Sequence, residues 1–327
     1  MLQYHCNTPA TPEPEPEVPE NAYLSDISPR DKPWDEHRSE ANIIQEHYNC
    51  PGRWYGRFLR MQECGQGIYY AWIDERGAWR FKLQEAHFCR SPGCPICAWR
   101  RSMKWQARFL KALPKIQEAH PKARWVFLSL TLRNCPVDEL GATLDTMAQA
   151  WHRILKRKEF RAVLGWIRAL EVTKNHKTGY AHPHIHALLM VRPSYFTHGY
   201  VTQPRWAELW AESLRIDYTP VVDIKAVKDK PDALKVAVYE TLKYTLKASD
   251  LADSQDWFLS CMAQLQKRRL ISSGGVLKGI LHEDKPETNK DLMLLGEGDR
   301  AEMEKWIRFD WRATVKRYQK SKGMPKP

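Results

Sequence analysis

Three histidines alternate along the stretch "AHPHIHALLMV", residues 181–191. Residues two apart on a β-strand point to the same face of a sheet, so His184 and His186 are placed to bind one divalent metal ion through their imidazole nitrogens. The apolar residues that follow predict a buried strand that would hold this pair in place. The alternative is a half-exposed strand whose histidines bind nothing. His182 precedes Pro183 and is either a hydrogen-bonding partner or an alternative ligand.

A carboxylate that can complete this site comes from the preceding segment. "GWIRALEVT" and "HPHIHALLMV" predict two strands joined by a loop over residues 174–181. In that register Glu171 lies opposite His184, and directly opposed residues share a face with Cβ atoms about 5 Å apart. Glu171 is therefore the predicted third metal ligand.

A tyrosine and a carboxylate occur one helical turn apart in "VAVYETLKYTLKASD". Glu240 and Tyr244 share a face of the helix predicted there, and Lys243 and Lys247 flank them as phosphate contacts. Beside a metal ion, a tyrosine can attack a DNA phosphate, whereas Glu240 can activate water and make cleavage final. Tyr244 can equally be a core aromatic residue, and Tyr239 is the rival nucleophile.

Cysteines gather between residues 64 and 97. "CRSPGCPIC" contains a pair spaced as in a zinc knuckle, and a fourth thiol lies in "ECGQG". Four thiolates fit a closed tetrahedral zinc site that stabilises a fold. His87 is an alternative fourth ligand, and unmetallated thiols under a loop are the other interpretation. The predicted ligands are Cys64, Cys89, Cys94 and Cys97.

A basic helix is predicted directly after the cysteines, over residues 98–119. Its start interleaves cations with Trp99 and Trp105, which suits phosphate contacts together with stacking on unpaired bases. A solvated basic face is the alternative. The predicted DNA contacts on this helix are Arg100, Arg101, Lys104 and Arg108.

The remaining segments predict the elements that must position these residues. Hairpins of strands with helices between them indicate an α+β fold with a central, mainly antiparallel sheet and flanking helices. Besides the hairpin, strands are expected over residues 124–134 and 220–227. Helices are expected over residues 137–160, 204–215, 232–247, 256–270 and 304–320.

The charge is strongly positive but uneven along the chain. Of the 327 residues, 51 are Lys or Arg and 39 are Asp or Glu, for a net charge of +12. Residues 1–48 hold 3 cationic and 10 anionic side chains, so the remaining chain is the basic part. A basic body with an acidic tail indicates a polyanionic partner, most simply nucleic acid, although a merely basic surface is the alternative.

The sequence contains no segment that predicts a membrane partner. Its apolar runs are all shorter than the roughly 18 residues needed to cross a bilayer, and its N-terminus lacks the pattern of a secretory signal. We therefore expect a cytoplasmic protein, in which the eight cysteines are reduced thiols or metal ligands.

These motifs, taken in order, resemble those of a known family. "FLSLTLRN", then "EVT" with "HPHIHALLMV", then "YETLKYTLKASD" are similar to the three motifs of rolling-circle plasmid replication initiators of the Rep_1 type, part of the HUH endonuclease superfamily. "HFCRSPGCPICAWRRSMKWQARF" is similar to the family's cysteine-rich region. The resemblance covers residues 50–280.

The resemblance implies a metal-dependent, site-specific endonuclease and strand transferase acting on single-stranded DNA. His184 and His186 match the histidines that bind Mg or Mn, with Glu171 where a third ligand often lies. Tyr244 matches the tyrosine that nicks the origin through a covalent 5′-phosphotyrosine and leaves a 3′-hydroxyl primer. Glu240 matches the carboxylate of the terminating hydrolysis. The implied partners are the double-strand origin, as an extruded hairpin, and a host helicase, polymerase and single-strand-binding protein.

With this resemblance the chain is expected to divide into four parts. Residues 1–48 form a disordered acidic leader rich in Pro and Glu, and residues 49–120 form a zinc-ribbon-like cysteine-rich module with the basic helix. Residues 121–281 form the nicking domain of HUH type, and residues 282–327 form a basic helical segment.

Three alternative functions remain open from the sequence. A transposase or relaxase of the same superfamily would share the chemistry in another biological setting. "HPHIHALL" also resembles the signature of histidine-triad nucleotide hydrolases, in which a histidine is the nucleophile. A zinc-stabilised DNA-binding repressor without enzymatic activity would explain the charge and the cysteines.

Overall fold

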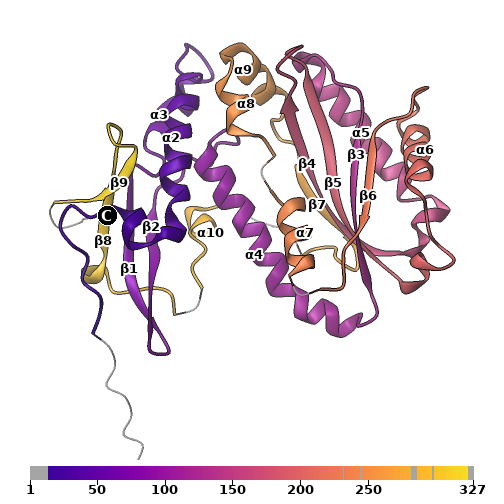
Figure 1. Cartoon of the computed structure of the whole chain (residues 1–327). Coiled ribbons are helices and arrows are strands. Elements are labelled where there is room, and N and C mark those ends of the chain that lie inside the picture. The colour runs from indigo at the N-terminus through magenta and orange to yellow at the C-terminus, as the bar shows by residue number, and fades with distance from the viewer. Residues whose placement is uncertain (1–13, 231, 244, 281–285, 297, 323–327) are drawn as a thin grey trace, which may run out of the picture.

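The computed structural model describes residues 14–230, 232–243, 245–280, 286–296 and 298–322. Two antiparallel sheets flank the long helix α4, as Figure 1 shows, so the expected α+β class is confirmed. The helices are α1 Leu24–Ile27, α2 Pro33–Glu46, α3 Tyr55–Gln62, α4 Pro95–Ala119, α5 Leu140–Ile154, α6 Gln203–Leu214, α7 Ala233–Thr241, α8 Ala248–Ala252, α9 Gln255–Gln264 and α10 Asn289–Met293. The strands are β1 Gly67–Glu75, β2 Ala78–Ala86, β3 Arg124–Thr131, β4 Val163–Lys174, β5 Ala181–Val191, β6 Val222–Ala226, β7 Ile271–Gly275, β8 Ile307–Arg312 and β9 Arg317–Lys320.

The five-stranded sheet has the order β6-β3-β5-β4-β7 and carries the histidine strand near its middle. Alternate side chains of β5 pack on opposite faces. Ile185 and Leu189 belong to the core that contains α5 and α6, whereas Leu188 and Met190 pack with residues of α4 and α7. The even-numbered histidines therefore lie on the face that α4 and α7 cover.

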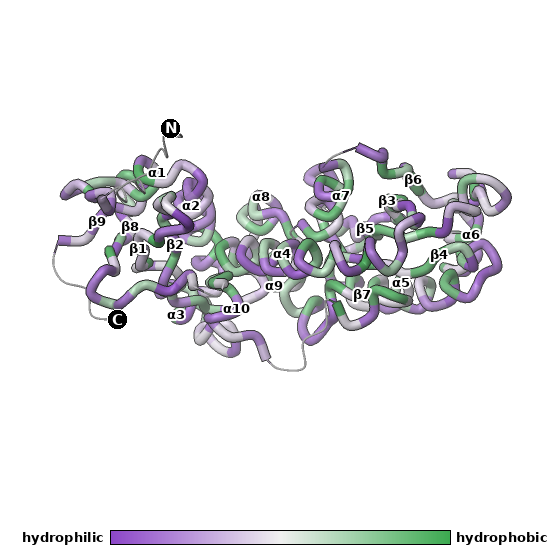
Figure 2. The backbone as a smooth tube through the Cα atoms, turned by 90° about the horizontal axis from the view of Figure 1, so that it is seen from below, coloured by the Kyte–Doolittle hydropathy of each residue, from purple (hydrophilic) through white to green (hydrophobic). Residues whose placement is uncertain are grey.

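Apolar residues concentrate along the strands of this sheet. In Figure 2, β4, β5 and β7 are largely green, while much of the outer surface is purple. Both faces of the sheet are covered by helices, which explains why β5 ends in a continuous run of buried residues from Ala187 to Val191. In the described part of the chain, no helix is long and apolar enough to cross a membrane.

The C-terminal segment corrects the predicted helix over residues 304–320. It forms the hairpin β8–β9, and β8 pairs with β1 in a second sheet of order β2-β1-β8-β9. Figure 1 shows these yellow strands beside the indigo N-terminal elements. Phe309 and Trp311 point inward with a period of two, which is the pattern of a strand with one buried face. The helical prediction for residues 282–327 was therefore wrong for this hairpin.

The predicted disordered leader is also wrong for part of its length. Within residues 1–48 the structure describes residues 14–48, which include α1 and α2. Trp34, Ala41 and Ile44 recur at helical spacing and are fully buried against the second sheet and α4. The Pro/Glu composition up to residue 20 concealed this amphipathic helix.

Helix α7 is shorter than the predicted helix over residues 232–247. It ends at Thr241, and the chain then runs along the edge of β4 beyond β7. The Val172 N–H donates to the Thr245 carbonyl at 2.8 Å, and Leu246 forms an isolated bridge with Val172. Pairing of residues 245 and 246 with β4 therefore replaces the last turn of the predicted helix.

Candidate functional site

Glu171, His184 and His186 meet on the α4/α7 face of the large sheet. Glu171 pairs with His184 across β4 and β5, which confirms the predicted register. Its Oε2 lies 2.7 Å from His186 Nε2 and 3.3 Å from His184 Nε2. Neighbouring ligands of an octahedral ion held at about 2.1 Å lie roughly 3.0 Å apart. The three side chains therefore have the spacing of a metal site.

His184 supplies a test of whether a metal fits here. Its Nε2 is buried, and Glu171 Oε2 lies 3.3 Å away without the geometry of a hydrogen bond. A cation bound between the two groups would satisfy this nitrogen better. The ring of His182 lies 4.9 Å from that of His184, and burial together with His184 lowers the pKa of His182. The donor set of two imidazoles and one carboxylate suits a divalent ion.

Strand β3 orients His186. Ser129 pairs with His186 across the sheet, and its Oγ lies 2.9 Å from His186 Nδ1. When Nδ1 carries the proton and donates to Ser129, Nε2 keeps its lone pair for a ligand. The ring of Phe127 stacks on the His186 ring, and the two ring centroids are 5.6 Å apart. Sequence reasoning missed Ser129, although Ser129 and Thr131 are the polar residues that alternate within the otherwise apolar start of "FLSLTLRN".

The charge of Glu171 is strongly stabilised. Burial acts to raise the pKa of this carboxyl group, but contacts from His184, His186 and Lys243 outweigh it and hold the pKa well below its usual range. Lys243 Nζ lies 3.0 Å from Glu171 and 2.7 Å from Glu240. Burial lowers the pKa of Lys243, and these two carboxylates more than reverse the effect and raise it. Lys243 thus links the predicted metal ligand to the predicted catalytic carboxylate.

Tyr244, the predicted nucleophile, lies outside the described residues. Its two chain neighbours are described: Lys243 reaches Glu171, and Thr245 pairs with β4. Glu240 is exposed near the end of α7. The rival Tyr239 is 40% exposed, and the ammonium group of Lys235 lies 5.8 Å from its ring centre.

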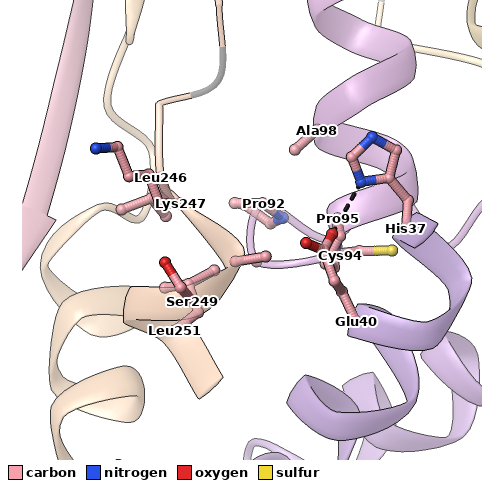
Figure 3. Close-up of a pocket in the computed structure, with 12 residues that line it drawn as sticks. His37, Glu40, Pro92, Cys94, Pro95, Ala98, Leu246, Lys247, Ser249 and Leu251 are labelled. Carbon is pink, nitrogen blue, oxygen red and sulfur yellow. Dashed lines mark hydrogen bonds and ion pairs between the residues drawn. The ribbon is translucent and has the colours of Figure 1, made fainter. Parts of the chain in front are cut away.

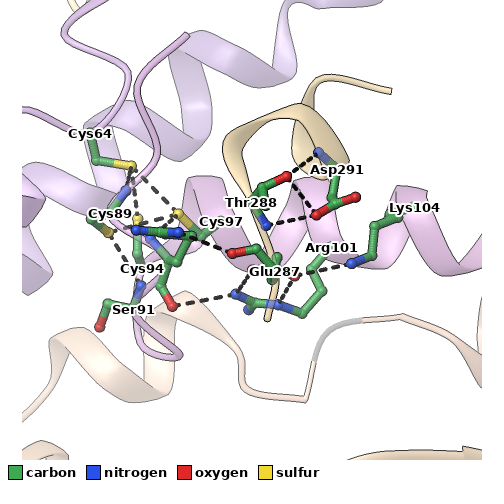
Figure 4. A network of polar contacts seen from close by, with 11 residues as sticks. Cys64, Cys89, Ser91, Cys94, Cys97, Arg101, Lys104, Glu287, Thr288 and Asp291 are labelled. Carbon is green, nitrogen blue, oxygen red and sulfur yellow. Dashed lines mark hydrogen bonds and ion pairs between the residues drawn. The ribbon is translucent and has the colours of Figure 1, made fainter. Parts of the chain in front are cut away.

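The four predicted cysteines form one buried cluster, shown in Figure 4. Cys64 precedes β1, Cys89 follows β2, and the other two lie at the start of α4. The Sγ of Cys64 lies 3.6 Å from that of Cys94 and 3.5 Å from that of Cys97, and Cys89 and Cys97 are 3.7 Å apart. Four thiolates around a tetrahedral zinc ion, with bonds of about 2.3 Å, would be roughly 3.8 Å apart.

The surroundings of the cluster also fit a bound cation. Backbone N–H groups of Cys89 and Arg90 point to the sulfurs of Cys64 and Cys97 at 3.4 and 3.3 Å. Burial raises the pKa of the Cys97 thiol well above its usual value, so a cation is needed to hold several thiolates there. His87 is exposed and does not belong to the cluster, so Cys64 is the fourth member.

The structure corrects the predicted DNA contact at Arg100. Its guanidinium group is buried and donates to the carbonyl oxygens of Leu292 and Met293, both at 2.7 Å. It therefore fixes α10 to α4 and cannot reach a phosphate. The prediction failed because burial by α10, nearly 200 residues away in sequence, leaves no local signal.

The other three cations of the predicted basic face differ in their surroundings. Arg101 donates to both oxygens of Glu287 at 2.7 and 2.9 Å, and Lys104 lies 3.3 Å from the same carboxylate. Figure 4 shows this group beside the cysteine cluster. Arg108 is exposed and lies over the Trp105 ring. Glu287 was not singled out in the sequence because it lies far from α4 along the chain.

Comparisons with known proteins were made over the whole chain. A family model described as "Replication protein", Rep_1, matches residues 80–319. The chain is 35% identical over 275 residues to "Protein rep" of Streptococcus pneumoniae, covering 81% of this chain and 84% of that protein. It is 36% identical over 280 residues to "Protein rep" of Bacillus amyloliquefaciens, covering 76% and 81%. No solved structure matches significantly.

Proposed function

The chain belongs to the Rep_1 family of replication proteins and is a plasmid replication initiator of that type, and from this premise we propose that it starts rolling-circle replication by nicking one strand of the plasmid origin. The observation that carries the proposal is the convergence of two imidazoles, a buried carboxylate and a lysine beside the segment that bears Tyr244. We assign the large sheet with its helices to the HUH type of nicking domain. The substrate is unpaired origin DNA.

Glu171, His184 and His186 hold the divalent ion in this proposal. Their ligand atoms all lie within 4.8 Å of one another, and Ser129 keeps His186 in the orientation that binding needs. Magnesium or manganese, when bound, would polarise the scissile phosphate and offset its negative charge. Because the carboxylate of Glu171 stays ionised, the site keeps its negative charge at neutral pH.

Tyr244 is the proposed nucleophile. Its phenolic oxygen attacks the phosphorus, a bond from that oxygen to the 5′-phosphate forms, and the bond to the 3′ oxygen breaks. The phenol releases its proton as it attacks, and the departing 3′ oxygen takes up a proton and becomes the hydroxyl group that primes the polymerase. The free tyrosine pKa lies near 10, so cations close to the phenol are required. Lys243 is the described cation next to Tyr244 in the chain, and it is positively charged here.

Glu240 is the proposed residue for ending the reaction. Its carboxylate is exposed and tied to Lys243 at 2.7 Å, so it lies at the same end of α7 as the proposed metal site. An accessible carboxylate there can take a proton from water for hydrolysis of the phosphotyrosine. Release of Lys243 toward a DNA phosphate would free Glu240 for this step.

The cysteine cluster is proposed to bind zinc in a structural role. The four thiols are all buried, which is typical of a closed site with four protein ligands. Arg101 and Arg108 on α4, with Lys247 beyond α7, are the proposed contacts to the phosphates of DNA. Lys104 is assigned to packing against Glu287 and Trp105.

The alternatives from the sequence are less well supported. The family and its relatives are replication proteins, which favours replication over transposition, conjugative transfer or nucleotide hydrolysis. A repressor without enzymatic activity would leave the cluster of Glu171, His184 and His186 unexplained. By the same family relation, a host helicase, polymerase and single-strand-binding protein are proposed to act after the nick.

The proposal is tested with a labelled single-stranded origin oligonucleotide and Mn²⁺. Wild-type protein is expected to form a covalent adduct that survives denaturing electrophoresis, and Tyr244→Phe is expected to form none. Tyr239→Phe is the matched control and should retain the adduct. An adduct with Tyr244→Phe that disappears with Tyr239→Phe would move the nucleophile to Tyr239, and no adduct with any protein would reject nicking.

A further inference from the structure

A cavity of about 260 Å³ lies between the cysteine-rich module and the nicking domain. One wall consists of the cysteine loop and the start of α4, at Pro92 to Ala98, together with His37 and Glu40 of α2. The opposite wall consists of residues 246–251, before and within α8. Figure 3 shows these two walls facing one another. Apart from Cys94 in the proposed zinc site and Lys247 as a proposed phosphate contact, these wall residues have no role in the proposed nicking reaction.

The cavity is close to the proposed metal site. Its wall residue Leu246 is bridged to Val172, the neighbour of the proposed ligand Glu171. The cavity wall and the proposed metal ligand are therefore adjacent along the backbone of β4. Lys247 is exposed on that rim, and in Figure 3 its side chain extends away from the cysteine loop. It can contact a flanking phosphate.

The walls have the composition of a site for one flat ring. They are mainly apolar, from Pro92, Gly93, Ala98, Leu246 and Leu251. The volume lies just below the range of about 300–1,000 Å³ that is usual for small-ligand pockets, which is enough for one compact ring system. Extruded nucleobases bind in pockets of this kind, between apolar surfaces and with a few polar groups at the ring edge.

The polar groups of the cavity are placed to select the base. Glu40 Oε2 lies 2.9 Å from His37 Nδ1, so α2 presents a carboxylate and an imidazole as one unit. The His37 ring in turn packs on Trp99, with centroids 5.1 Å apart. A carboxylate only accepts hydrogen bonds, and it therefore favours a base with an exocyclic amino group.

We propose that this cavity binds one unpaired base of the origin strand next to the nick, and that Glu40 selects a base with an amino group. The inference rests on the proposed nicking function and adds a residue that determines its sequence specificity. The exposed cation Lys247 on the rim favours DNA as the occupant. A segment of a partner protein is the competing occupant.

The test uses a pool of random single-stranded oligonucleotides, Mn²⁺ and recovery of covalent adducts for sequencing. Wild-type protein is expected to prefer an amino-bearing base at one position near the nick. In Glu40→Gln the new amide can also donate, so the preference at that position alone should fall about tenfold. Glu36→Gln, on the same helix but outside the cavity, should leave every preference unchanged.

A second variant fills the cavity without touching Glu40. Ser249 is exposed on the opposite wall, and Ser249→Trp should weaken the same preference as Glu40→Gln while adduct formation on other positions keeps its pattern. If both variants kept the base preferences of wild type, the proposed base pocket would be overturned. If they kept these preferences but no longer supported plasmid replication, the cavity would instead bind a partner protein. No adduct with wild-type protein would instead reject the nicking function and this inference with it.

Discussion

Ser129 is not a ligand of the proposed metal site, but it orients the ligand His186. Its hydroxyl group lies 2.9 Å from His186 Nδ1 and fixes which ring nitrogen faces Glu171. Removing such an outer partner typically costs about 10- to 100-fold in metal affinity. We expect Ser129→Ala to weaken Mn²⁺ binding by that factor in calorimetric titration, with the fold unchanged by circular dichroism.

The control for this prediction is Ser272→Ala. Ser272 lies on strand β7 and accepts a hydrogen bond from Arg168 of strand β4. It does not contact the metal site. Its substitution should leave Mn²⁺ affinity at the wild-type value. Equal affinity in Ser129→Ala and wild type would show that the hydroxyl group does not orient His186.

At the scale of residues, local spacing predicted the metal ligands themselves better than it predicted the residues around them. The period of two along β5 and one hairpin register placed Glu171, His184 and His186 together. Arg100 was predicted wrongly because its partners are carbonyl groups of α10. The contacts of Glu287 with Arg101 and of Lys243 with Glu171 depend on how distant elements pack, and no spacing along the chain encodes them.

Helix α4 is held to the segment before α10 by one carboxylate. Glu287 accepts from Arg101 at 2.7 and 2.9 Å and lies 3.3 Å from Lys104, with 16% of its side chain exposed. Burial acts to raise the pKa of Glu287, but Arg101 and Lys104 outweigh it and lower the pKa. We expect Glu287→Gln to reduce the free energy of unfolding by about 2 kcal/mol at pH 7, measured by urea denaturation.

The pH dependence of this loss follows from the lowered pKa. The contribution of Glu287 is fully present above the unfolded-state pKa, near 4.3, and disappears as pH falls through the lower folded-state value. The difference between wild type and Glu287→Gln should therefore shrink below about pH 4.3. Glu302→Gln, at an exposed position, is the control. A pH-independent difference would contradict a role for the Glu287 charge.

At the scale of elements, the sequence predicted four strands of the large sheet but missed β7, and it predicted the ends of the chain poorly. The strands over 124–134 and 220–227 and the helix over 98–119 correspond to β3, β6 and α4. The hairpin β8–β9 was misassigned because short apolar alternation around Phe309 resembles one helical face. Pairing with β1, more than 200 residues away in sequence, decides its conformation.

At the scale of the whole molecule, α4 connects the two sheets, because it begins within the cysteine cluster and extends to the proposed nicking domain. Cys94 and Cys97 flank its first residues, and farther along Trp105 and Phe109 pack in one core with Val238 and Leu242. Loss of the proposed zinc should therefore disturb both modules. Cys97→Ser is expected to lose the single zinc ion per chain and to lower the melting temperature by about 10 °C or more.

Zinc analysis by mass spectrometry and a thermal melt check this prediction. Cys50→Ser is the matched control, since Cys50 is free and outside the cluster. It should retain both the zinc and the melting temperature. A zinc-free wild-type protein, or an unchanged melt in Cys97→Ser, would contradict the structural role of the cluster.

The central claim is that a divalent ion held by His184, His186 and Glu171 is needed for nicking. The most direct measurement follows Mn²⁺ binding and adduct formation together in wild type and in His184→Ala/His186→Ala. We predict one bound Mn²⁺ and an adduct in wild type, and neither in the double variant, whose melting temperature stays near that of wild type. Adduct formation at the wild-type rate in the double variant, or in wild type with excess chelator, would contradict the account.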